Sequence, residues 1–140
     1  MDPGPPQPDL AAIPALIGSF TAIGMDVDLE VTGPQDEVGL GMALTVYRTI
    51  QEGLTNVLKH APGARACVTV EIALSEVTVR ILDTGGVRTA GPGTGNGLIG
   101  LRERVALFNG RFQAGPSELG WALEVVLPRD ASSHPARTPR

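Results

Sequence analysis

Cysteine and long apolar runs are scarce in this chain of 140 residues. Its one cysteine, Cys67, has no second cysteine to form a disulfide with and stands in no cluster with metal-ligand spacing, so we expect a reducing, cytoplasmic setting. The longest apolar stretch, over residues 10–25, is interrupted by Pro14 and Gly18 and falls short of the roughly 20 residues that span a bilayer. We therefore expect no transmembrane helix.

Basic residues are not in excess either. The chain has 11 Lys and Arg against 15 Asp and Glu, a net charge of -4, and its pI is about 5.1. Surfaces that bind nucleic acid or anionic lipid concentrate Lys and Arg, so we expect no nucleic acid partner and no membrane contact. The first residues, MDPGPPQPD, also lack the positive charge with which a signal peptide begins.

Hydrophobic patterning fills the middle of the chain and is missing at both ends. Prolines crowd the start, and ASSHPARTPR closes the chain without apolar periodicity. We expect a flexible segment at residues 1–8, one domain at 9–129 and a disordered tail at 130–140. The hydrophobic content of 42% is enough to build one core in a domain of that size.

The patterned region alternates between the periods of strands and helices. Alternating apolar and polar side chains predict strands at residues 26–32, 68–74, 77–81 and 121–127, and allow a short one at 111–114. Apolar residues at helical spacing predict helices at residues 10–23, 38–60 and 98–109. Asn109-Gly110 is typical of a left-handed helix C-cap. Because each strand has one apolar face, we predict a two-layer α/β sandwich with helices on one face of the sheet and solvent on the other.

The helix predicted at residues 38–60 carries a polar stripe opposite its apolar one. Glu52, Asn56 and Lys59 stand at i, i+4 and i+7, so their side chains lie on one helix face. A solvated polar surface is the ordinary interpretation of this stripe. The functional interpretation is that the Asn56 oxygen binds Mg²⁺, that Glu52 acts as a general base, and that Lys59 meets a phosphate as a point charge.

A first glycine cluster follows the third predicted strand. Asp83-Thr84-Gly85-Gly86 has the ordinary composition of a turn. A carboxylate at that position is also suited to accept a hydrogen bond from an exocyclic amino group such as that of adenine, and Gly85 would let the base lie close to the backbone.

A second cluster, at residues 91–100, has five glycines in ten positions and leads into the last predicted helix. A flexible linker is one interpretation. We favour a phosphate site, because the free N–H groups and the dipole at a helix start both attract an anion. The run lacks the GK[ST] ending of a P-loop, and no strand directly precedes its G-x-G-x-x-G match, as a dinucleotide fingerprint requires.

Three ordered motifs together resemble a known family. YRTIQEGLTNVLKHA, the Asp83-x-Gly85 turn and GNGLIGLRERV resemble the N, G1 and G2 boxes of sensor histidine kinases, and GNGLIGLRERV is the most specific of the three. The chain looks like the short-lidded subfamily related to nitrate and nitrite sensors. The resemblance covers residues 8–128 or so.

This resemblance implies the Bergerat ATP-binding fold, with a mixed sheet and the nucleotide held between the N-box helix and a lid at residues 87–94. By resemblance, Asn56 would ligate Mg²⁺, and Glu52 would be the N-box acid that assists phosphoryl transfer. Asp83 would bind adenine, supported by Gly85. The residues that would lie near the phosphates or cradle them are Lys59, His60, Gly95, Gly97 and Leu98.

The sequence also departs from the family pattern. Val87 stands where G1 boxes commonly have a second glycine, and Asn96 stands where G2 boxes often have His. Gly53 replaces a usual Ala, which would lower helix propensity without touching the site. The two histidines, His60 and His134, fall in the N box and the tail, so no helix carries a phosphoacceptor histidine.

We therefore predict the catalytic domain of a protein-histidine kinase that uses ATP and Mg²⁺. It would transfer the γ-phosphoryl group to a histidine on a dimerisation domain absent from this chain, for relay to a response regulator. The parent protein would be a homodimer, either soluble or membrane-anchored, and the chain alone should not autophosphorylate. Two alternatives stay open: a serine kinase of the anti-sigma-factor type, which GLIGLRERV disfavours, and a non-catalytic nucleotide-binding module, suggested by Val87 and the short lid.

Overall fold

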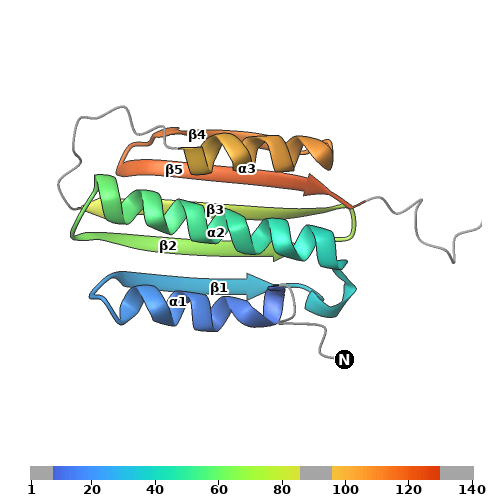
Figure 1. Ribbon diagram of the computed structural model, residues 1–140, viewed down its shortest axis with the longest axis horizontal. Coiled ribbons are helices and arrows are strands. Elements are labelled where there is room, and N and C mark those ends of the chain that lie inside the picture. The colour runs from blue at the N-terminus through green and yellow to red at the C-terminus, as the bar shows by residue number, and fades with distance from the viewer. Residues whose placement is uncertain (1–7, 86–95, 130–140) are drawn as a thin grey trace, which may run out of the picture.

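The computed structural model describes residues 8–85 and 96–129 (Figure 1). In chain order the elements are η1 (Leu10–Ala12), α1 (Ile13–Thr21), β1 (Asp26–Thr32), η2 (Gln35–Glu37), α2 (Leu40–His60), β2 (Ala64–Ile72), β3 (Glu76–Gly85), α3 (Asn96–Leu107), β4 (Arg111–Pro116) and β5 (Gly120–Pro128).

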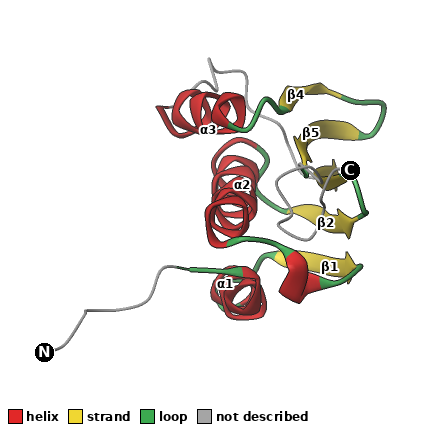
Figure 2. Cartoon of the chain, turned by 90° about the vertical axis from the view of Figure 1, so that its right-hand side faces the viewer, coloured by secondary structure: helices red, strands yellow, loops and turns green. Residues whose placement is uncertain are grey.

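The strands form one mixed sheet of five strands in the order β1-β2-β3-β5-β4. β1 is parallel to β2, because the chain crosses over through α2 between them, and every other pair of neighbouring strands is antiparallel. The helices α1, α2 and α3 lie side by side against one face of this sheet (Figure 2). The predicted two-layer α/β sandwich is therefore confirmed.

The core lies between the two layers. The strand register brings Val68, Ile81 and Leu123 into one cross-strand row, and each is at most 2% exposed. The apolar stripe of α2 packs onto such rows through Ala43, Val46, Ile50, Leu54 and Val57. Since full burial of a large aliphatic side chain stabilises by about 1.5–3 kcal/mol, this interlayer is the main hydrophobic contribution to the fold.

Gly53 allows α2 to lie close to the sheet. A Cβ atom at this position would overlap Cδ1 of Ile81 and would lie 3.2 Å from Cδ2 of Leu123. The expectation that glycine here only lowers helix propensity is therefore incomplete, because the missing side chain makes room for the buried side chains of β3 and β5.

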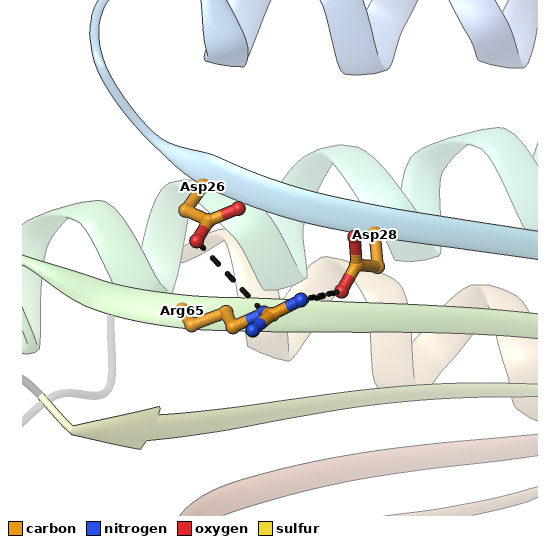
Figure 3. A network of polar contacts seen from close by, with 3 residues as sticks. All are labelled: Asp26, Asp28 and Arg65. Atoms are coloured by element: carbon orange, nitrogen blue, oxygen red, sulfur yellow. Dashed lines mark hydrogen bonds and ion pairs between the residues drawn. The ribbon is translucent and has the colours of Figure 1, made fainter.

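The face of the sheet away from the helices is covered by polar side chains that pair across strands. Arg65 of β2 lies 2.6 Å from a carboxylate oxygen of Asp28 and 3.8 Å from one of Asp26, both on β1 (Figure 3). The pKa of the Arg65 guanidinium is raised, mainly by its hydrogen bond to Asp28 and secondly by the negative charge of Asp28. On the neighbouring strands Arg80 donates to Glu124 at 2.7 Å. Because these charges are solvated and paired with one another, this face is stable without a covering layer.

The structure adjusts several predicted boundaries. The strand predicted at residues 68–74 begins at Ala64 and ends at Ile72, and Leu74 lies beyond it, 80% exposed, in the turn before β3. The helix predicted at residues 10–23 is the short η1 followed by α1. Leu58 stands four residues after the buried Leu54, yet it is 39% exposed near the C-terminal end of α2. Asn109 adopts φ 59, which confirms the left-handed cap after α3.

Within residues 8–85 and 96–129, no helix combines the length and the apolar character that a membrane span would need.

Candidate functional site

The candidate site begins where α2 meets the start of α3. Glu52 is partly buried on α2, and its carboxylate lies against Gly97, the second residue of α3. A Cβ atom at Gly97 would lie 2.7 Å from the carboxyl carbon of Glu52 and would overlap its Oε1. A side chain at this position would displace the Glu52 carboxylate, so the N-box and G2-box residues that the sequence singled out are in direct contact.

Asp83 is the second fixed point of the site. It lies near the C-terminal end of β3, on the side of the sheet that faces the helices, and it is only 1% exposed. Its Oδ1 accepts a hydrogen bond from the backbone N–H of Trp121 at 2.9 Å. Gly120 permits this approach, because a Cβ atom there would overlap Oδ1 of Asp83. A buried carboxylate needs hydrogen-bond donors, and β5 supplies one of them.

Gly85 ends β3 in a conformation that favours glycine. Its φ is +77, and among the described residues no heavy atom lies within 4 Å of a Cβ atom built at this position. The backbone conformation therefore favours glycine here.

Asn56 comes level with Asp83 along the sheet. Gly53 packs directly against the Ile81 side chain. From this contact, both α2 and β3 run toward the end of the sheet where β2 begins. Three helical residues advance about 4.5 Å and two strand residues about 6.6 Å, so Asn56 and Asp83 reach similar heights. The polar stripe of α2 therefore runs from Glu52 toward the level of the buried carboxylate.

Lys59 and His60 lie in the last turn of α2. Lys59 is exposed and His60 is partly buried. Positive charge at a helix C-terminus is stabilising in itself, which gives Lys59 an ordinary structural role. Their contact with phosphate stays a prediction.

Several predicted site residues lie outside the described residues. Gly95, Gly86 and the lid expected at residues 87–94 are among them. Of the G2 loop, Gly97 and Leu98 are described, in the first turn of α3 and partly buried. Backbone N–H groups in this first turn have no partner within the helix and favour an anion.

A metal ion at this site would depend on few protein oxygens. Within the described parts of the chain, no three His, Cys, Asp or Glu side chains gather in a way that would hold a metal. Mg²⁺ bound mainly to phosphates and water needs few protein oxygens, and Asn56 as its neutral oxygen ligand stays a prediction.

Two features of the site escaped the sequence analysis. Trp121 holds Asp83 through its backbone N–H, a contact for which a side-chain pattern carries no signal. Arg48 and Arg104 flank Glu52 in a pocket of about 300 Å³ between α2 and α3. Arg48 stands at i-4 from Glu52, and this spacing is the one signal for it that the sequence contained.

A larger pocket, of about 620 Å³, lies at the β4–β5 side of the molecule. Its walls include Leu82, Gln113 and Ala122, and none of the predicted site residues line it. The contacts of Glu52 and the burial of Asp83, rather than pocket size, therefore define the candidate site.

Comparison with known proteins gives relatives of one kind. No protein-family model matches the chain. It is 27% identical over 128 residues to the sensor histidine kinase MctS of Rhizobium johnstonii, an alignment that covers 87% of this chain and 28% of that protein. It is 31% identical over 107 residues to the sensor histidine kinase YxjM of Bacillus subtilis, covering 75% of this chain and 26% of that protein. The chain thus spans about a quarter of the length of these relatives.

Solved structures with a similar fold are also histidine kinases. The blue-light activated histidine kinase of Erythrobacter litoralis superposes with a TM-score of 0.66 at 19% identity, over 89% of this chain and 42% of that one. The catalytic domain of the histidine kinase ThkA superposes with a TM-score of 0.63 at 15% identity, over 84% of this chain and 87% of that domain.

The second match spans nearly a whole catalytic domain, so this chain has the fold of such a domain. The comparisons do not single out the nitrate and nitrite sensors, so that part of the resemblance stays a prediction. In sequence the chain is similar to sensor histidine kinases, and in fold it is similar to histidine kinase catalytic domains.

Proposed function

We propose that this chain binds ATP with Mg²⁺ and transfers the γ-phosphoryl group to a histidine on a dimerisation domain, for relay to a response regulator. The observation that carries this proposal is the contact between Glu52 of α2 and Gly97 of α3. It brings a carboxylate next to the helix start at which phosphates are expected to bind.

Each predicted residue has a chemical role in this reaction. The buried carboxylate of Asp83 accepts a hydrogen bond from the adenine amino group, while the Trp121 N–H holds it in place. Gly85 gives the ring access. The N–H groups of the first α3 turn, Gly97 and Leu98 among them, receive phosphate oxygens.

The transfer step needs an acceptor for one proton. A nitrogen of the neutral imidazole attacks the γ-phosphorus, the bond to the β–γ bridging oxygen breaks, and ADP leaves with that oxygen. The imidazole then gives up a proton, and Glu52 is the carboxylate available to take it. Mg²⁺, bound through Asn56 and phosphates, would supply charge neutralisation. Lys59 would add positive charge near the phosphates, and His60 would lie beside them.

The proposal also covers the surroundings of the domain. The partners are a phosphoacceptor domain and a response regulator, and the parent protein is a homodimer that holds this domain in the cytoplasm. Because positioning supplies most of the catalysis of phosphoryl transfer, the chain alone should form little phosphohistidine.

Calorimetric titration with ATP tests the nucleotide site. Asp83→Asn keeps one carbonyl oxygen for the Trp121 N–H and replaces the other acceptor by a donor. We expect the Kd for ATP to rise about 10- to 100-fold, the range for losing a hydrogen bond to a charged group. Asn56→Ala should weaken ATP binding with Mg²⁺ present and have little effect in its absence.

Two results would contradict this assignment. One is unchanged ATP affinity in both variants, which would move the nucleotide elsewhere. The other is an acid-stable phosphoserine on an added partner in place of acid-labile phosphohistidine, which would favour a serine kinase.

A further inference from the structure

β5 starts directly beside the buried carboxylate of Asp83. A Cβ atom at Gly120 would overlap Oδ1 and the backbone oxygen of Asp83, and it would lie 3.1 Å from the carbonyl carbon of that residue. The next residue, Trp121, donates its backbone N–H to the same Oδ1 at 2.9 Å. The first two residues of β5 therefore act on Asp83 together, one by leaving room for the carboxylate and the other by binding it.

The backbone conformation of Gly120 is not what requires glycine there. Gly85 has a positive φ, whereas Gly120 does not. Gly115, in the same β4–β5 hairpin, has room for a side chain, because a Cβ atom there would meet none of the described atoms within 4 Å. The close approach of Asp83 is therefore what excludes a side chain at position 120.

The hairpin turn holds Gly120 in place. The Ser117 N–H donates to the Gly120 oxygen at 2.9 Å, and the Gly120 N–H donates to Oγ of Ser117 at 3.2 Å. Trp121 is 8% exposed and stands opposite Asp83 in the register of β5 with β3. A side chain added at Gly120 can therefore be accommodated only by moving the Asp83 carboxylate and separating the two strands at this point.

We infer that Gly120 is a positioning residue for base recognition. By leaving room for Asp83, it holds the carboxylate where that group accepts a hydrogen bond from the exocyclic amino group of the base. The inference rests on the proposed function, since it takes Asp83 as the residue that binds adenine. Selection of the amino group then depends on β5, a strand to which the sequence analysis assigned no site residue.

A small displacement of the carboxylate is enough for this effect. N–H···O hydrogen bonds are found at about 2.7–3.2 Å, so a shift of about 1 Å removes one. Because Asp83 is 1% exposed, little water is at hand to replace the lost donor. Gly97 and Leu98, which are expected to bind phosphates, belong to α3 and not to the hairpin. The loss of affinity should therefore fall on the amino group of the base and not on the phosphates.

The test uses two nucleotides that differ only in the exocyclic amino group, ATP and purine riboside triphosphate. Calorimetry with the 140-residue chain and Mg²⁺ gives the Kd of each. We expect the wild-type chain to bind ATP about 10- to 100-fold more tightly, the range for one hydrogen bond to a charged group. In Gly120→Ala this preference should fall to about twofold or less, because the Kd of ATP rises toward that of the analogue.

The ratio of the two Kd values separates positioning from a loss of folding. If only a fraction of a variant is folded, the apparent Kd of both nucleotides rises by the same factor and the ratio stays as in wild type. Asp83→Ala removes the carboxylate itself and should lower the preference to the level of Gly120→Ala. Gly115→Ala is the matched control, since it makes the same substitution in the same hairpin without contact to Asp83, and it should keep the wild-type preference.

Each failure gives a different result. If the wild-type chain binds neither nucleotide, the proposed function fails. If it binds both equally, Asp83 does not select the amino group and the positioning role of Gly120 is wrong, although ATP binding stands. If Asp83→Ala loses the preference and Gly120→Ala retains it, the positioning inference alone is overturned. An equal loss of preference in Gly115→Ala would overturn it as well.

Discussion

The close approach of α2 to the sheet at Gly53 can be tested by changing both sides of the contact. In Gly53→Ala the added methyl group meets Cδ1 of the fully buried Ile81. Overpacking of this kind costs about 2 kcal/mol, and the better helix propensity of Ala returns about 1 kcal/mol. We therefore expect a net loss of about 1 kcal/mol in the free energy of unfolding.

The second change removes the colliding atom. Ile81→Val deletes Cδ1 and should cost about 1 kcal/mol by itself. In the double variant the methyl group of Ala fills the space that Cδ1 vacates, so its stability should return to within about 0.5 kcal/mol of wild type. Independent effects would instead add to a loss of about 2 kcal/mol, so the expected coupling is about 1.5–2 kcal/mol.

Urea unfolding followed by fluorescence measures these energies, because Trp121 is the single tryptophan and is 8% exposed in the folded chain. With a slope of about 1.5 kcal/mol per molar urea, each 1 kcal/mol moves the midpoint by about 0.7 M. Gly18→Ala is the control, since a Cβ atom at that position of α1 would meet none of the described atoms within 4 Å. It should stabilise by about 1 kcal/mol and add independently to Ile81→Val. Additive losses in the Gly53 cycle would refute the packing argument.

Two further substitutions test local features. Gly97→Ala should force the Glu52 carboxylate away from α3 and lower the rate of transfer to an added phosphoacceptor domain at least tenfold. Gly18→Ala, in α1 and outside the candidate site, should keep that rate, and equal rates in the two variants would contradict the contact between Glu52 and Gly97. Asn109→Ala should lower the free energy of unfolding, measured with urea, by about 1–2 kcal/mol, because a φ of 59 strains a residue with a Cβ atom. Asn109→Gly should cause no such loss. An unchanged free energy of unfolding in the Ala variant would argue against the left-handed cap.

The sequence predicted elements better than contacts. Alternation at residues 26–32 identified β1 with its bounds, because one face of that strand packs under α1 and the other is solvated. The same alternation predicted that the second strand ends at Leu74, whereas β2 ends at Ile72. Alternation shows which side chains are apolar, but it does not show where backbone pairing stops. Parallel pairing of β1 with β2 depends on the path of α2 through space, which no local pattern encodes.

The site divides in a similar way. Family-like motifs predicted Glu52 and Gly97 separately, and their contact follows from the packing of α2 against α3. Helical periodicity identified the buried stripe of α2 but not how closely its backbone approaches the sheet, so the role of Gly53 became visible only with Ile81 in view. The Trp121 N–H that holds Asp83 is a backbone group, and its alignment is set by the register of β3 with β5.

The outward face of β1 has a consequence for self-association. This strand is at one edge of the sheet, where unpaired backbone groups invite another strand to add. Asp26, Asp28 and Glu30 stand exposed along it, and Arg65 pairs with the first two. A second copy added edge to edge would bring the uncompensated acidic charge of both strands together. This repulsion would keep the edge of the sheet free of fibril-like stacking.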